Sequence, residues 1–186
     1  MKRFLIIALT AFVFSLAAPA LADDAPAFDP HNLTYEDAAM HFTAPKDYQR
    51  LEVPPAPEAT TLYPVAVFAR SAGKPEQRTI MISVEPYQGS IDGFESNSEN
   101  ELRTQIEGVF VDHKTRTALA NGMPVWWQKI SFGEGLGNTY RRYAYVGFDG
   151  RRGISVSITG RLGELSEEEA KTALADLSIV VYPAGR

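Results

Sequence analysis

Residues 118–161 constrain the fold more than any other stretch, because they contain two strong β-hairpin signals. Asn121-Gly122 and Asp149-Gly150 each stand between runs of β-branched and aromatic residues. Both dipeptides tolerate the positive φ angles of a type I′ turn. A third reversal at residues 133–138 lies between two further runs of strand-forming residues. Three turns therefore join four consecutive strands in an antiparallel meander.

Residues 1–22 have the parts of a secretory signal peptide. Lys2 and Arg3 precede an apolar run, and Ala20-Leu21-Ala22 forms a small-residue cleavage site before an acidic pair. We predict cleavage after Ala22 and a periplasmic or secreted protein. A retained membrane anchor is the alternative, since the apolar run approaches the ~20 residues that span a bilayer. No transmembrane segment is expected after cleavage.

The remaining chain is predicted to form a mobile N-terminal arm, residues 23–34, and a single domain, residues 35–186. The arm is rich in Ala, Pro and Asp. The whole sequence has 23 acidic against 18 basic residues, which excludes nucleic acid as a partner because such binding needs a basic footprint. There is no cysteine, so disulfides and thiolate metal sites are excluded and stability must come from packing.

Several strands are predicted before the meander. Residues 40–42 and 49–53 are expected to form a first hairpin, ended by a cluster of prolines. Alternating apolar residues at 63–70 and 79–85 predict a second hairpin, whose loop contains glycine and proline at 71–77. The sheet is therefore expected to extend well beyond the meander.

Two helices are predicted from spacing and capping signals. Helical spacing follows the second hairpin, and Ser98 with Glu101 matches a capping box. Ser166 with Glu169 repeats this signal and opens a helix with apolar residues at i, i+3, i+4 and i+7 spacing. Residues 179–182 either form its docked end or a short strand. The expected fold class is α+β, a mainly antiparallel sheet with a C-terminal four-strand meander flanked by two helices in an α/β/α sandwich.

The sequence resembles the PsbP-like superfamily, which includes photosystem extrinsic proteins and bacterial envelope proteins. The likeness spans residues 38–182 and rests on Met40-His41-Phe42-Thr43-Ala44-Pro45, Ser90-Ile91-Asp92-Gly93-Phe94, Leu119-Ala120-Asn121-Gly122-Met123-Pro124, Asp149-Gly150-Arg151 and the helix after Ser166. The resemblance implies an α/β/α sandwich used as a binding or accessory module. The family's bacterial lipoproteins carry a cysteine at the mature N-terminus, and this chain has none.

Catalytic signatures are weak. Asp112, His113 and Ser155 could be drawn as a triad, but the serine lacks the closing glycine of a nucleophile elbow and lies in an alternating strand. The glycines of residues 133–137 have neither the spacing nor the following helix of a phosphate loop. The acidic run 167–169 fits the first turn of a helix, where the macrodipole favours acids. An enzymatic function is therefore the less favoured interpretation.

A metal site and a cofactor are not predicted. Five residues near the N-terminus could be proposed as a metal cluster, but they lack a defining ligand spacing: Asp29, His31, Glu36, Asp37 and His41. The three histidines also lack the spacing of a triad.

Strand parity suggests one candidate binding surface, since side chains two apart share a face. We call it the mixed face. It is predicted to gather Trp127, Lys129, Arg141, Tyr143 and Tyr145, together with the hydroxyls of Ser155, Ser157 and Thr159. Rings interleaved with cations suit an acidic group, a carbohydrate or a partner protein. The alternative is that a helix covers these rings as ordinary core.

These observations favour an exported, non-catalytic binding or accessory module of the cell envelope. Its partner is predicted to be a protein or a small acidic or carbohydrate ligand. The alternatives are an envelope enzyme of hydrolase-like class and a structural envelope component. A catalytic site should bring polar residues with perturbed pKa values together in a deep pocket, whereas a binding module should present a shallow aromatic face.

Overall fold

The computed structural model describes residues 28–54, 63–106, 108–134 and 138–182. Its elements follow one another as β1 (Thr34–Glu36), β2 (Met40–Thr43), β3 (Gln49–Leu51), β4 (Tyr63–Arg70), β5 (Arg78–Pro86), α1 (Ile91–Gln105), β6 (Phe110–Ala118), β7 (Pro124–Glu134), β8 (Asn138–Phe148), β9 (Arg152–Arg161), α2 (Glu167–Ala173) and β10 (Ser178–Ile179). The predicted α+β class is confirmed. Within the described ranges, no helix is long and apolar enough to span a bilayer.

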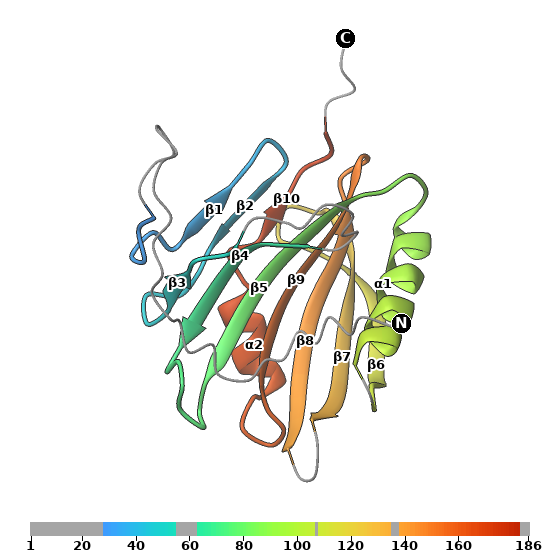
Figure 1. The fold of residues 1–186 in the computed structure, drawn as a ribbon. Helices are drawn as coiled ribbons and strands as arrows, with labels where there is room; N and C mark the ends of the chain where they lie inside the picture. The colour runs from blue at the N-terminus through green and yellow to red at the C-terminus, as the bar shows by residue number, and fades with distance from the viewer. Residues whose placement is uncertain (1–27, 55–62, 107, 135–137, 183–186) are drawn as a thin grey trace, which may run out of the picture.

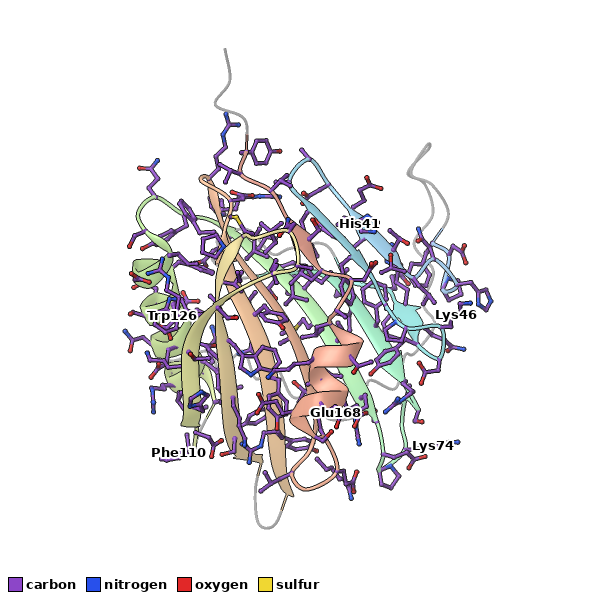
Figure 2. All side chains as sticks on the ribbon, turned by 180° about the vertical axis from the view of Figure 1, so that it is seen from behind. His41, Lys46, Lys74, Phe110, Trp126 and Glu168 are labelled. Carbon is purple, nitrogen blue, oxygen red and sulfur yellow. The ribbon has the colours of Figure 1, made fainter. Side chains whose placement is uncertain are left out.

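A seven-stranded sheet forms the centre of the molecule. Its strands are hydrogen-bonded in the order β3-β4-β5-β9-β8-β7-β6, and every neighbouring pair is antiparallel. The two helices pack on opposite faces, α1 beside β6 to β8 and α2 on the reverse side (Figures 1 and 2). We call these the α1 face and the α2 face. They give the predicted sandwich.

The predicted meander is confirmed as β6 to β9. The glycines of its two hairpin dipeptides, Gly122 and Gly150, have φ angles of 84° and 96°. Asn121 and Asp149 do not have positive φ, so the turns are not of type I′. In the first of these turns the amide of Gly122 donates to the carbonyl of Leu119, and Gly122 is the one residue of the turn with a left-handed φ angle. The hairpin of β4 and β5 is also confirmed.

The predicted first hairpin is wrong. Strand β2 does not pair with β3; it pairs with β1 on one side and with β10 on the other, in a separate three-stranded sheet. Strand β3 pairs with β4 at the edge of the large sheet. Of residues 179–182, for which a docked helix end or a short strand was expected, only Ile179 lies in a strand, the two-residue β10. The described end of the expected arm, residues 28–34, lies against the domain, with Leu33 packed on the core.

The two helices begin at serines, but only one start was predicted correctly. Ser166 caps α2, its hydroxyl accepting from the amide of Glu169 at 3.1 Å. The first helix begins at Ser90, whose hydroxyl accepts from the amide of Gly93. Ser98, the predicted cap, is a buried residue in the middle of α1. The position before the helix decides, because a cap needs extended backbone, and Ser90 has it.

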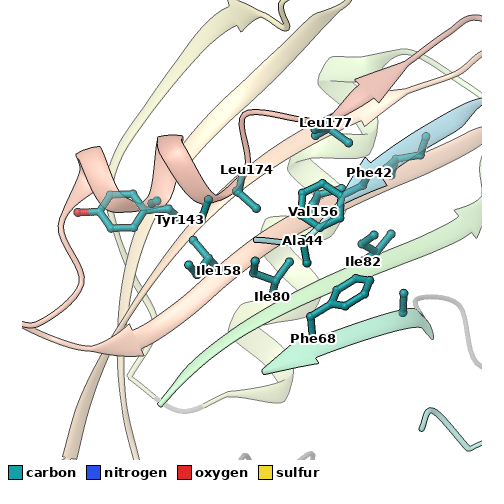
Figure 3. Packing of buried hydrophobic residues seen from close by; sticks show 14 of the residues in the cluster. Phe42, Ala44, Phe68, Ile80, Ile82, Tyr143, Val156, Ile158, Leu174 and Leu177 are labelled. Carbon is teal, nitrogen blue, oxygen red and sulfur yellow. The ribbon is translucent and has the colours of Figure 1, made fainter. Parts of the chain in front are cut away.

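The main hydrophobic core lies between the large sheet, α2 and the small sheet (Figure 3). Phe42 of β2 packs against Phe68 of β4, with ring centroids 5.9 Å apart. Tyr143 and Ile158 lie under α2, close to Leu174 (Figure 3). A smaller cluster on the α1 face centres on Phe94 and includes Ala144 and Val146. Both helices are thus held by burial of apolar surface.

Candidate functional site

The five residues predicted for the mixed face lie on the α2 face, and α2 covers the centre of it. Trp127 pairs in register with Tyr145, and Lys129 with Tyr143. Trp127 and Tyr143 are 2% and 3% exposed, so both belong to the core. The indole Nε1 donates to Glu167 at 3.2 Å, and the Lys171 ammonium lies 5.6 Å from the Trp127 ring centroid. The open aromatic surface expected at these two positions is therefore absent.

The other three members of that set are only partly exposed. Arg141 donates to Asp112 at 2.6 Å, a carboxylate that also accepts from the Ser131 hydroxyl. Tyr145 packs on Trp127 with ring centroids 4.6 Å apart, and burial raises its pKa. Lys129 is half-buried. These three residues lie at the edge of the hydrophobic core.

The serines expected beside these rings lie on the opposite side of the sheet. Tyr145 pairs with Val156 and Tyr143 with Ile158, so the apolar side of β9 shares the α2 face with the aromatics. Ser155 and Ser157 point to the α1 face, where each is 1% exposed. The parity within each strand was predicted correctly, but the phase between β8 and β9 was wrong. The aromatic side chains of β8 belong to the core and lie on the same face as the aliphatic side chains of β9.

The residues that suggested a catalytic triad and a metal cluster are also separated. Asp112 is on the α2 face, bonded to Arg141, whereas Ser155 is on the α1 face. His41 lies 3.6 Å from Asp176, and Asp37 is bonded to Arg152. Among the described residues, no group of three or more side chains is placed to hold a metal ion.

The larger cleft lies between α2 and the start of β3 and has a volume of about 390 Å³. Arg70 crosses it, donating to Asp47 at 3.1 Å and to Glu169 at 2.6 Å. The guanidinium carbon also lies 5.5 Å from the ring centroid of Tyr48. The buried Tyr48 hydroxyl has no hydrogen-bond partner in the described part of the chain, and burial raises its pKa to about 12. The Arg70 charge is therefore already matched, and the network ties α2 to the sheet.

The α1 face contains a strip of buried polar side chains. Packing of this face against its neighbours would require only apolar side chains. Its members are Ser83 and Glu85 of β5, Arg142 of β8, and Ser155 and Ser157 of β9. We call it the Arg142 strip. In register, Ser83 is opposite Ser155 and Glu85 is opposite Gly153. The five residues thus lie on neighbouring strands of one face.

Arg142 is the most unusual member of the strip. It is 6% exposed, and its guanidinium donates from Nη2 to the Ser155 hydroxyl at 2.9 Å. Its Nε has no hydrogen-bond partner, and no ion pair is formed by Arg142 in the part of the chain that the structure describes. Burial lowers the pKa of Arg142 to about 10. An arginine buried without a counter-ion is costly, because the lost hydration is not replaced.

Glu85 is also perturbed. Its burial, with a smaller contribution from the nearby charge of Glu101, raises the pKa of the Glu85 carboxyl to about 7. Its Oε2 atom is buried and has no hydrogen-bond partner among the described residues. The carboxyl is therefore close to half-protonated at neutral pH.

A small cleft of about 80 Å³ opens on the same face, beyond the end of the Arg142 strip. We call it the basic cleft. It is lined by Lys74, Pro75, Gln77, Thr79, Tyr140, Thr159, Gly160 and Arg161. Thr159 is the cross-strand partner of Arg142, and Tyr140 is two residues before it on the same face. The described lining residues include two cations and no acid.

The sequence contains one signal for Arg142. Its parity places it on the same face of β8 as Ala144, Val146 and Phe148, which is an apolar stripe. A charged residue within such a stripe indicates either a buried ion pair or a functional group. The basic cleft had no comparable signal, because its residues come from two separate hairpins.

No family model matches the sequence, and no curated protein matches it. Solved structures do. LpqN of Mycobacterium tuberculosis, described as involved in cell envelope biogenesis, is 14% identical, with a TM-score of 0.51 over 76% of this chain and 83% of that chain. The cyanobacterial PsbP (CyanoP) of Synechocystis is 11% identical, with a TM-score of 0.47 over 86% of this chain and 98% of that chain. A protein of unknown function from Pseudomonas aeruginosa is 14% identical, with a TM-score of 0.47 over 62% and 78%. The likeness to LpqN, at 14% identity, is a likeness of fold alone.

Proposed function

We propose that this chain is an exported, non-catalytic binding or accessory module of the cell envelope. The observation that carries the proposal is the Arg142 strip, a buried arginine among hydroxyls that has no counter-ion within the described residues. Side chains of this kind are suited to holding a polar group. The strip offers no histidine beside its serines, since His113 lies on the α2 face with Lys129.

Export is the second part of the proposal. It is supported by the basic start, the apolar run and the Ala20-Leu21-Ala22 site. An envelope setting is compatible with the likeness in fold to LpqN. The mature chain is expected to begin at Asp23.

The experiment combines location with capture. The intact mass of the protein recovered from the periplasmic fraction should correspond to a chain starting at Asp23. That protein, cross-linked in the native envelope, should yield the same defined partner in repeated purifications, and Arg142→Gln should lose this partner while the exposed variant Arg103→Gln retains it. A full-length chain found with the membrane, or capture that is indifferent to Arg142, contradicts the proposal.

One observation favours the enzyme alternative. Glu85, with a pKa of about 7, shares the α1 face with Ser83 and Ser155, and a carboxyl with such a pKa is suited to acid-base chemistry. An enzyme would turn over model esters or glycosides with a rate that follows ionisation near pH 7. Turnover that Glu85→Gln abolishes would establish this alternative in place of the binding module.

A further inference from the structure

We propose that the free edge of β6 binds an extended segment of a partner protein, which joins the large sheet as an additional antiparallel strand. Strand β6 is the last in the hydrogen-bonded order of that sheet, and eight of its nine residues are exposed. Figure 2 shows it at the rim of the sheet, with Phe110 labelled at its start. This surface is separate from the Arg142 strip and goes beyond the function proposed from that strip.

The hydrogen bonds at the turn between β6 and β7 determine which backbone groups of β6 face outward. The Leu119 amide donates to the Met123 carbonyl at 2.9 Å, so Leu119 faces β7. Residues along an antiparallel strand alternate between facing the neighbouring strand and facing away from it. The partner of Ala118 is Pro124, which has no amide, and this agrees with the alternation. The amides and carbonyls therefore point away from β7 at three residues: Lys114, Arg116 and Ala118.

These outward groups have no hydrogen-bond partner within the described part of the chain. The edges of two other strands are closed. In β1 the amide of Thr34 donates to the Asn32 side chain at 3.1 Å, and its carbonyl accepts from Arg50. In β3 the amide of Arg50 donates to the carbonyl of Pro30 at 2.9 Å. An edge that keeps its donors and acceptors free is a template for another strand.

The usual protections of an edge strand do not block this one. Proteins commonly protect an edge with charged side chains or with a β-bulge. Lys114 and Arg116 are tied to carboxylates of α1 at 3.1 to 3.3 Å, so both cations lie over the α1 face. The bulge of β6 lies between Val111 and His113 and leaves residues 113–118 in regular register. A further strand can therefore pair along this stretch.

The side chains of β6 select the occupant. A second copy is disfavoured, because every two-fold register centred on residues 114–116 places a cation opposite a cation, and like charges opposite one another destabilise a strand pair. On the α2 side the edge presents Thr115 and Thr117, which suit β-branched neighbours. Arg116 is half-exposed and its partner Asp92 is exposed, so the guanidinium is available to a new carboxylate. The occupant is therefore a segment with an acidic residue opposite Arg116 and β-branched residues on either side of it.

The test measures amide hydrogen exchange in the purified protein by NMR. The probe is the peptide Thr-Val-Glu-Val-Thr with acetylated and amidated ends. In the free protein the outward amides of Lys114, Arg116 and Ala118 should exchange quickly, whereas the inward amides of Thr115 and Thr117 should exchange slowly. Saturating peptide should slow the outward amides at least ten-fold and leave the inward ones unchanged. A ligand held by side chains alone would not give this alternation.

Methylation of the peptide nitrogens provides matched control probes. N-methylation of the glutamate and both threonines removes the donors that face β6 and should abolish the protection. N-methylation of the two valines changes the opposite edge of the probe and should preserve the protection. Replacement of the glutamate by lysine should weaken binding several-fold, because it sets a second cation opposite Arg116.

Variants at Arg116 separate its backbone from its charge. Arg116→Pro removes an outward amide but no hydrogen bond to β7, and it should weaken the probe at least ten-fold. Arg116→Gln keeps the backbone and should bind the glutamate and lysine peptides equally. Arg103→Gln removes an exposed cation of α1 that shares Glu99 with Lys114, and it should retain the preference for glutamate. Should Arg116→Pro fail to fold, the methylated probes test the same hydrogen bonds.

Three results would overturn the proposal. Equal protection by the probe methylated at glutamate and threonine would mean that no strand is added. Absence of protection by every probe would mean that the edge does not bind an extended chain. A mass that doubles with protein concentration in analytical ultracentrifugation, together with protection of the outward amides, would identify the occupant as a second copy. None of these results bears on partner capture through Arg142, which has its own variant.

Discussion

Glu85 shows how one buried side chain makes stability depend on pH. Its pKa is raised from 4.5 to about 7, so the folded chain holds a proton that the unfolded chain releases. Stability is therefore lost as pH rises from about 4.5 through 7. Glu85→Gln should raise the free energy of unfolding at pH 8 by on the order of 2 kcal/mol and leave it unchanged at pH 4.

Urea denaturation at the two pH values measures this difference. Glu52→Gln, at an exposed glutamate, is the control and should change little at either pH. A gain of equal size at pH 4 and pH 8 would mean that the ionisation of Glu85 is not the cause.

Residue by residue, the sequence singled out the important aromatics but left open whether they form a binding surface or part of the core. Trp127, Tyr143 and Tyr145 share one face, as strand parity predicts. Whether that face is solvent-exposed or buried depends on α2, which follows more than twenty residues later in the sequence. This helix packs on the face through Leu174 and its neighbours. Parity does not contain this information, because it describes one strand at a time.

At the scale of elements, Trp127 should behave as a core residue. It contacts α2 through Glu167 and Lys171, stacks on Tyr143 and packs against Tyr145 in a tilted arrangement. Trp127→Ala should reduce the free energy of unfolding by about 3 kcal/mol or more, because it leaves a large cavity under α2. The partly buried Trp126, which packs beside α1, is the matched control, and Trp126→Ala should cost clearly less. Chemical denaturation followed by far-UV circular dichroism gives both values; equal costs would show that α2 does not seal this face.

The start of α1 provides a second prediction for an element. Ser90 caps the helix, whereas Ser96 is an exposed serine within it. Ser90→Ala should destabilise the protein by about 1 kcal/mol through the lost cap. Ser96→Ala should be neutral or slightly stabilising, because alanine is the better helix former. Thermal unfolding of the two variants separates them, and a loss at Ser96 comparable with that at Ser90 would contradict the assigned start.

The same element shows why capping signals are ambiguous. Ser98 and Glu101 match a capping box as well as any pair in the chain, yet Ser98 is buried inside α1. The competing signal, Ser90 followed by Gly93, lacks the acidic residue of the box. A hydroxyl caps only where the backbone before the helix is extended, and this is set by the preceding loop. The helix itself could be predicted, but its first turn could not.

At the scale of the whole molecule, local pairings were predictable and distant ones were not. The β4–β5 hairpin and the meander join strands through short loops, and turn residues mark them in the sequence. The small sheet joins β2 to β10, which are separated by most of the chain. Strands β2 and β10 are joined by two residue pairs, too few to produce a periodic pattern in the sequence. The predicted hairpin of β2 with β3 failed because nearness in sequence was taken for nearness in space.

Arg152 fastens the small sheet to the large one. From the start of β9 it donates to Asp37, beside β1, at 2.8 and 3.1 Å, and to the buried Asp149 at 2.8 Å. Burial by itself would raise the pKa of Asp37, but hydrogen bonds from Arg152, the Ala39 amide and the Tyr35 hydroxyl outweigh it and hold the pKa at about 2. The ionised carboxylate is therefore part of the joint between the two sheets.

The pH dependence of this joint follows from the sign of that shift. Because the pKa in the folded chain lies below the ordinary value of 3.8, the ionised form contributes stability that is complete above about pH 4 and is lost as pH falls toward 2. Asp37→Asn should lower the free energy of unfolding by about 2 kcal/mol at pH 7, and the difference from the wild type should shrink toward zero near pH 2. Asp29→Asn, at an exposed aspartate that accepts from the His31 amide, should show no such convergence. Amide hydrogen exchange locates the effect: at pH 7, Asp37→Asn should speed exchange in β1, β2 and β10 more than in β7 and β8. Uniform acceleration across both sheets would mean that the small sheet opens only with the whole domain, and that Arg152 does not act as a separate joint.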